Sequence, residues 1–158
     1  MTRKNKFLQA GLIIIVFSMF FTSCASMRTA GYNERETIVR FARNMMNKNY
    51  AYGENDPSKG FDCSGLVFYA YKEAGMIVPR TAEAQYKKAR KIELKDAQEG
   101  DVLFFSTYAP GPTHVGIYLG GGRFIHSPSE GKKVQIVDVE KNYWKKNFYA
   151  AATFFPGK

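Results

Sequence analysis

Three side chains in this sequence have the types that thiol chemistry needs: Cys63, His114 and His126. Cys63 stands at the start of a segment with helical apolar spacing, which predicts that it lies in the first turn of a helix. Unpaired amides and the positive end of the helix dipole stabilise a thiolate there, and we expect them to lower the pKa of the thiol. A thiolate attacks carbonyl carbons, so Cys63 is a candidate nucleophile. A buried structural cysteine is the alternative.

The two histidines, His114 and His126, both fall in alternating apolar segments that are typical of strands. If residues 120–122 form a three-residue loop, Gly116 pairs with His126, and His114 lies on the same face one diagonal step away. A two-residue loop would place the imidazoles on opposite faces. The first register brings both rings together on one side of a hairpin.

In that register the three residues have separate roles. Cys63 attacks a carbonyl, His114 acts as its base and then protonates the leaving amine, and His126 orients His114. Metal binding by the same residues is the competing use, but their spacing lacks the close ligand pairs typical of structural zinc sites. We therefore expect neither a metal nor another cofactor.

The elements that position these residues fall into two halves. In the first half, apolar spacing and capping residues predict three helices: Asn33 to about Asn47, Cys63 to Ala74, and a helix capped by Thr81 that runs to about Ala89. After Gly100, short apolar runs between turn residues predict five strands: 101–105, 114–119, 123–127, 134–138 and 149–155. The sequence thus predicts an α+β domain over residues 33–158, with N-terminal helices packed on a five-stranded antiparallel sheet.

The composition is that of one globular domain. The 158 residues are 45% hydrophobic and 23% charged, which argues against a disordered chain, and two cysteines cannot build a multi-disulfide fold. The formal net charge of +9 favours contact with polyanions such as membranes, cell-wall polymers or nucleic acid, without choosing among them.

Residues 1–23 have the organisation of an export signal. Three basic side chains precede the apolar stretch 7–21, which is too short to span a bilayer comfortably. Two small residues then precede Cys24, and the series resembles the lipobox of bacterial lipoproteins, in which the cysteine thiol carries diacylglycerol. The resemblance implies a lipid anchor on Cys24 and a tether over residues 24–32. An ordinary secretory signal is the alternative.

Two consequences follow from an acylated Cys24. Ala25 in place of Asp after the cysteine indicates, by analogy with Gram-negative sorting, the outer membrane facing the periplasm. Cys63 would then have no partner for a disulfide, and a lone thiol in an exported protein calls for a reason.

Six short motifs occur in order along the chain: Tyr50–Gly53, Phe61–Val67, Pro79–Thr81, Gly100–Phe105, His114–Gly120 and Phe124–His126. Over about residues 34–155 this series resembles the NlpC-type cell-wall peptidases, and within them the small outer-membrane murein endopeptidase lipoproteins. The resemblance implies a papain-like core and hydrolysis of peptide bonds in bacterial peptidoglycan. Carried over by position, the roles of Cys63, His114 and His126 agree with those argued above.

The resemblance also implies a substrate subsite lined by a tyrosine, Asp62 and Ser64, because a carboxylate and hydroxyls suit the amine of a stem peptide. The tyrosine is Tyr50 or Tyr52, and Arg80 lies either near this subsite or on the surface.

The implied partners are peptidoglycan stem peptides and the membrane reached through Cys24. We expect a monomer that does not bind nucleic acid. The bond that is cut lies next to the diamino acid, either inside a stem or in the crosslink between stems. A noncatalytic lipoprotein that binds the cell wall is the alternative function.

Overall fold

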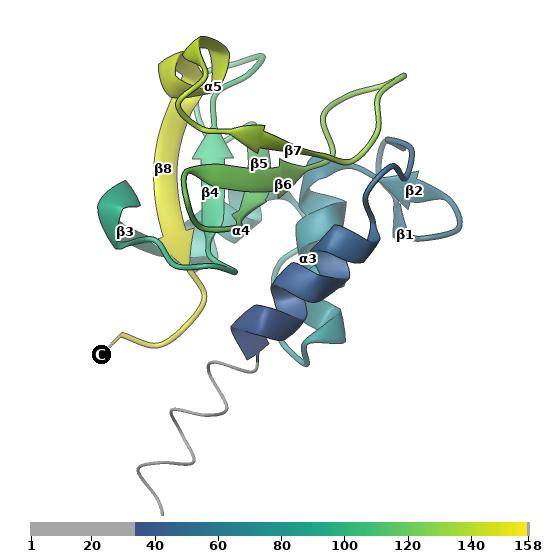
Figure 1. Ribbon diagram of the computed structural model, residues 1–158, viewed down its shortest axis with the longest axis horizontal. Coiled ribbons are helices and arrows are strands. Elements are labelled where there is room, and N and C mark those ends of the chain that lie inside the picture. The colour runs from purple at the N-terminus through teal and green to yellow at the C-terminus, as the bar shows by residue number, and fades with distance from the viewer. Residues whose placement is uncertain (1–33, 158) are drawn as a thin grey trace, which may run out of the picture. The chain divides into compact units, whose positions relative to one another are not determined.

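The strands that the apolar pattern predicts pair into one antiparallel sheet in a computed structural model that describes residues 34–157 (Figure 1). The sheet has the order β3-β8-β4-β5-β6-β7. Its strands are β3 (Arg90–Ile92), β4 (Val102–Phe105), β5 (His114–Tyr118), β6 (Arg123–His126), β7 (Gln135–Asp138) and β8 (Phe148–Thr153). The α+β class is confirmed, and each of the five predicted strands is present within two residues of its predicted ends.

The predicted number of strands is wrong, because the sheet has six. The additional strand, β3, pairs with β8 at one edge of the sheet. Arg90 and Lys91 are exposed and Ile92 is half-buried, so this strand has no alternation of buried side chains to detect. Short, charged strands are a common way to protect a sheet edge. A separate pair of strands, β1 (Asn55–Asp56) and β2 (Gly60–Phe61), precedes Cys63 in the sequence.

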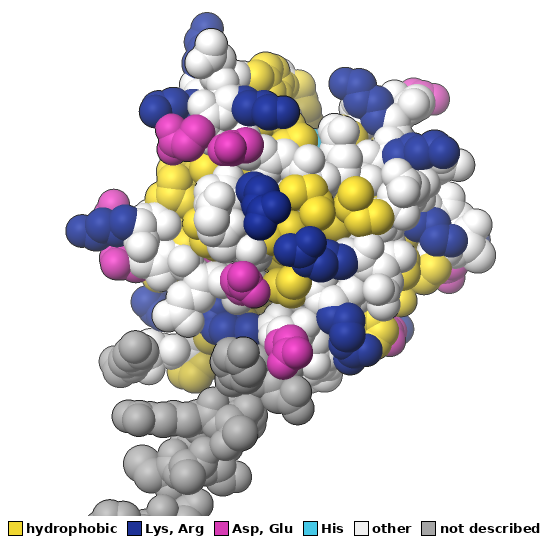
Figure 2. Space-filling view, in the orientation of Figure 1, with side chains coloured by type: hydrophobic (Ala, Val, Ile, Leu, Met, Phe, Trp, Pro, Cys, Tyr) yellow, Lys and Arg dark blue, Asp and Glu magenta, His cyan; other side chains and the backbone are white. Residues whose placement is uncertain are grey.

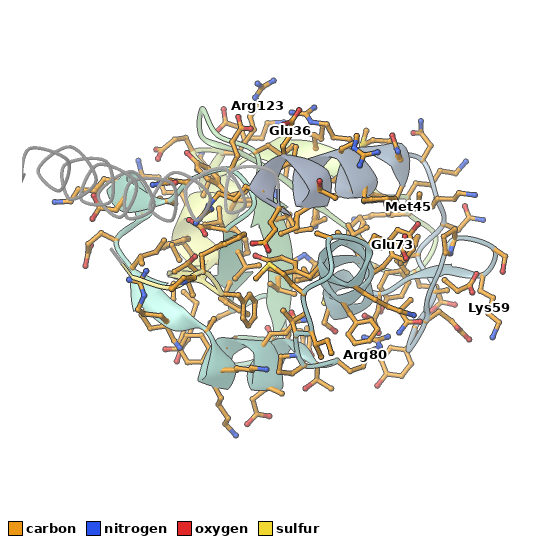
Figure 3. All side chains as sticks on the ribbon, turned by 90° about the horizontal axis from the view of Figure 1, so that it is seen from below. Glu36, Met45, Lys59, Glu73, Arg80 and Arg123 are labelled. Atoms are coloured by element: carbon orange, nitrogen blue, oxygen red, sulfur yellow. The ribbon has the colours of Figure 1, made fainter. Side chains whose placement is uncertain are left out.

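Two helices cover one face of the sheet. The helix over residues 34–44 and α3 (Cys63–Glu73) lie side by side (Figures 1 and 3) and share the main hydrophobic core with the strands. The first helix ends three residues before its predicted end, since residues 45–47 form a turn in which Asn47 has a φ of 66°. The extent predicted for α3 is confirmed to within one residue.

A third helix and a second core complete the described part of the chain. α4 (Ala82–Lys88) begins after Thr81, whose side chain accepts a hydrogen bond from the Ala84 amide, as the capping prediction requires. A short helix that the sequence did not predict, α5 (Asn142–Asn147), contributes Trp144 to a smaller core. The buried residues of that core are Leu103, Phe105, Phe124, Val139 and Ala151.

The hairpin of β5 and β6 has the register predicted from the glycine loop. Ile117 pairs with Ile125 and Tyr118 with Phe124, which continues to Gly116 opposite His126. All three glycines of the loop 120–122 have positive φ angles, between 57° and 75°. Such angles are costly for residues with a side chain, so the glycines permit this loop. The hairpin therefore carries both histidines on one face.

The signal segment 1–23, the tether 24–32 and Cys24 lie outside the described residues. Within residues 34–157, no helix combines the length and hydrophobicity that crossing a bilayer requires.

Candidate active site

Cys63 is the first residue of α3, as predicted, and its side chain is half-buried. The helix packs on β5, and the backbone N–H groups of Val115 and Ser64 lie close enough to the thiol to favour its ionised form. Val115 directly follows His114 in the sequence. The packing of α3 on β5 therefore brings the thiol to the end of the strand that carries the first histidine.

The pKa of Cys63 differs from the prediction. Burial, and to a smaller extent the nearby carboxylate of Asp62, raises the pKa of the thiol to about 11, although the N–H groups around the sulfur act to lower it. The predicted lowering is wrong because loss of solvation outweighs the helix amides and their dipole. The resting thiol is therefore protonated at neutral pH, and its reaction with a carbonyl requires a base.

His114 and His126 form a hydrogen-bonded pair. Nε2 of His114 lies 2.8 Å from Nδ1 of His126, which confirms the predicted meeting of the two rings. Both side chains are buried, and Figure 2 shows almost no histidine on the face it presents. Because Nε2 of His114 faces its partner, Nδ1 is the ring nitrogen that is left to take up a proton.

Both imidazoles are uncharged at neutral pH. Burial lowers the pKa of His114 to about 4. Burial also lowers the pKa of His126, and the positive charges of His114 and Lys132 lower it further, to about 2. His126 thus stays neutral when His114 takes up a proton, and its Nδ1 can accept the hydrogen bond from the protonated ring.

The contact between the two imidazoles is a hydrogen bond. One ring nitrogen of each histidine is directed at the other ring, at a distance at which one nitrogen donates a proton to the other. Within residues 34–157, no group of three or more His, Cys, Asp and Glu side chains is arranged to hold a metal ion.

Aromatic side chains enclose the histidine pair. The Trp144 ring centroid lies 4.7 Å from that of His126, nearly perpendicular to it, and 5.6 Å from that of His114. Phe105 and Phe124 pack against the same indole. The sequence analysis missed Trp144, and the one available signal was that it is the sole tryptophan of the chain. Exclusion of water by these rings explains the low pKa of both imidazoles.

Arg80 and Asp62 form a polar cluster on the other side of Cys63. The Arg80 guanidinium donates to both Asp62 carboxylate oxygens, at 2.9 and 2.8 Å, and also to Oγ of Ser64. Asp62 additionally accepts hydrogen bonds from the Gly53 and Gly65 amides. Arg80 thus contacts two of the residues predicted to line the subsite, Asp62 and Ser64, which corresponds to the first of the two positions considered for it.

The two candidate tyrosines, Tyr50 and Tyr52, differ in their surroundings. Tyr50 forms a β-bridge with Phe61, two residues before Cys63. Burial, together with the charges of Cys63 and Asp62, raises the pKa of the Tyr50 phenol. The Tyr52 side chain is 90% exposed. Of the two candidate tyrosines, Tyr50 is therefore the one near Cys63.

The family model described as NlpC/P60 family matches residues 47–153. The Escherichia coli murein DD-endopeptidase MepH is 44% identical over 108 residues, which are 66% of this chain and 40% of that protein. The Bacillus subtilis bifunctional muramidase/DL-endopeptidase CwlT is 41% identical over 112 residues, 70% of this chain and 33% of that protein. The chain thus spans less than half the length of these two relatives.

Solved structures have the same fold. A lipoprotein-like protein of the NLP/P60 family from Staphylococcus aureus has a TM-score of 0.69 at 34% identity, with 78% of this chain and 42% of that chain covered. The peptidoglycan hydrolase RipB from Mycobacterium tuberculosis has a TM-score of 0.70 at 28% identity, with 82% and 69% covered.

Proposed function

Because this chain belongs to the NlpC/P60 family, we propose that it is a peptidoglycan endopeptidase of the cysteine type. Two relatives, a murein DD-endopeptidase and a muramidase/DL-endopeptidase, support this substrate class. The observation that carries the proposal is the 2.8 Å contact between His114 and His126 beside the helix that begins with Cys63.

The proposed reaction begins with proton transfer. Nδ1 of His114 takes the proton of the Cys63 thiol as the sulfur attacks the carbonyl carbon of the peptide bond. The imidazolium then donates this proton to the nitrogen of the leaving amine, and a thioester remains on Cys63. Water, with His114 again as the base, attacks the thioester and regenerates the thiol. His126 accepts the hydrogen bond from Nε2–H of His114 throughout.

The raised pKa of the thiol and the lowered pKa of His114 are compatible with this mechanism. Both groups are neutral at rest, so charge separates only as the sulfur attacks. Water-poor surroundings strengthen each electrostatic interaction at that moment. The active form of the enzyme holds a neutral imidazole, and activity should fall as the pH drops toward the His114 pKa of about 4.

Tyr50, Asp62 and Ser64 are the proposed substrate-binding residues. Arg80 already engages both oxygens of Asp62, so this carboxylate meets an incoming amine with its charge largely balanced. The phenol of Tyr50 and the hydroxyl of Ser64 supply further acceptors. We assign Asp62 two tasks, which are to cap α3 through the Gly65 amide and to orient Ser64.

Lipid anchoring is a separate part of the proposal. The export signal and Cys24 support a lipoprotein attached to the outer membrane and facing the periplasm. Cys24→Ala removes the acyl acceptor, so it should leave an uncleaved or soluble protein. Identical partition of wild type and variant between membrane and soluble fractions would contradict the anchor.

Digestion of purified peptidoglycan sacculi tests the activity. The wild type should release muropeptides, and their masses identify the bond, either between D-glutamate and the diamino acid of one stem or in the crosslink between stems. Cys63→Ser is nearly isosteric but far less acidic, so release should stop while the circular dichroism spectrum is retained. Substantial release by Cys63→Ser, or loss of wild-type activity with a chelator, would overturn the thiol mechanism.

A further inference from the structure

The segment after β6 returns to the site and places a lysine beside Tyr50. The Tyr50 amide donates to the Lys132 carbonyl oxygen at 2.9 Å, and Asn49 pairs with Lys133 in an antiparallel bridge. In this register Lys132 is opposite Tyr50, so the two side chains leave the same side of the ladder. The Lys133 side chain leaves the other side.

Lys132 is an exposed cation without a carboxylate partner among residues 34–157. The ion pairs of this part of the chain involve other residues: Arg35–Asp101, Lys59–Glu54, Arg80–Asp62, Lys87–Glu83 and Lys145–Glu140. The acidic group nearest the nucleophile, Asp62, is already held by Arg80. Lys132 therefore adds an unbalanced positive charge to the site.

The charge of Lys132 acts at the histidine pair as well. It is one of the three causes that lower the pKa of His126. Lys132 thus lies opposite Tyr50 on the neighbouring segment, and its charge also acts on His126 at the end of β6. A ligand group bound by Lys132 would therefore lie beside Tyr50, one of the proposed substrate-binding residues.

We propose that Lys132 binds a carboxylate of the peptide substrate, close to the scissile bond, and so makes the enzyme selective for stem peptides with a free carboxylate there. The inference rests on the proposed function. A γ-linked glutamate keeps its α-carboxylate, and a diamino acid can carry a second one, so the substrate class supplies the group. The ammonium of a lysine forms charge-assisted hydrogen bonds with such a group.

Two synthetic stem peptides test this selectivity. They differ in one group next to the scissile bond, a carboxylate in one and a carboxamide in the other. For the wild type, kcat/KM should be about tenfold higher with the carboxylate, the size expected of a charge-assisted hydrogen bond. Lys132→Gln should reduce this ratio to near one, and Lys132→Glu should invert it. Lys133→Gln, one residue away on the opposite side, is the matched control and should keep both activity and ratio.

Binding to the inactive Cys63→Ala variant separates this inference from the proposed function. Calorimetry with the same peptides should give a lower Kd for the carboxylate form, and the additional Lys132→Gln change should remove the difference. A peptide that binds with this preference but is not cleaved by the wild type contradicts the endopeptidase and supports the Lys132 subsite. Equal Kd values for the two peptides, or a preference that survives Lys132→Gln, overturn the subsite.

Discussion

Asp62 and the histidine pair, the two groups that flank Cys63, are held in place by different interactions. On one side, Asp62 accepts hydrogen bonds from the Arg80 guanidinium and from two backbone amides, so several donors hold its carboxylate. On the other side, the histidine pair has one hydrogen bond between its members, and Nε2 of His126 is buried without a partner in the described part of the chain. Packing against Trp144 and Phe124 holds those rings.

This difference matches what each side has to do. A carboxylate that several donors hold keeps a fixed position, which suits a group that caps α3 and orients Ser64. Imidazoles held by packing keep their ring nitrogens available for proton transfer, and the water-poor environment keeps them neutral. Ionic hydrogen bonds therefore hold Asp62 in place, and aromatic packing holds the two histidines. Substitutions of the histidines should therefore act mainly on kcat/KM, and substitutions around Asp62 mainly on the free energy of unfolding.

The largest effect is expected from the histidines. His114→Ala removes the base and should lower kcat/KM by about a thousandfold. His126→Ala should cost about tenfold to a hundredfold, and His126→Asn less, because an amide can still accept the hydrogen bond from Nε2 of His114. Kinetics of the three variants on one soluble stem peptide measure this order. If His126→Ala loses no more than His126→Asn, packing alone orients His114, and the hydrogen bond has no orienting role.

Arg80→Met should act mainly on stability. It leaves the carboxylate of Asp62, 13% exposed, without its main partner, so the free energy of unfolding should fall by about 2 kcal/mol. Arg80→Lys keeps the charge but loses the two-pronged geometry and should recover part of this. Urea unfolding of both variants gives the values. A stability equal to wild type for Arg80→Met would show that the Gly53 and Gly65 amides suffice to hold Asp62.

Trp144→Ala should act on the pH profile more than on stability. Water that enters the vacated space raises the pKa of His114 from about 4 toward its usual value, because solvation favours the charged ring. The acidic limb of kcat/KM should therefore move to higher pH, with about a tenfold loss at neutral pH from poorer orientation. Trp144→Phe keeps an apolar ring and should remain close to wild type. An acidic limb that stays in place in Trp144→Ala would exclude the indole as the cause of the low pKa.

The sequence predicted the hairpin and the main helices because their signals are local. The three glycines at 120–122 define the register, and this register brings His114 to His126. The start of α3 follows from the apolar spacing after Cys63. These features depend on neighbours within a few residues, for which periodicity and turn chemistry are informative.

The remaining features depend on contacts between distant segments. Arg80 reaches Asp62 across 18 positions, and no spacing rule relates the two. Trp144 lies in a six-residue helix whose N-cap residue makes no side-chain hydrogen bond, so neither periodicity nor capping indicates it. The pKa of Cys63 was mispredicted for a similar reason. The helix position was visible in the sequence, but the burial that outweighs it is a property of the folded chain.

The hairpin also limits which substitutions this site can accept during evolution. A Cβ at Gly116 would lie 2.6 Å from a Phe124 ring carbon and 2.8 Å from the Ile125 carbonyl oxygen. At residues 120–122 any L-residue with a side chain incurs a backbone penalty of roughly 1–2 kcal/mol, smallest for Asn and Asp. Four of the residues between the two histidines therefore accept few replacements. Substitutions can accumulate on the surface around these glycines, whereas the hairpin register, and with it the distance between the imidazoles, should change little.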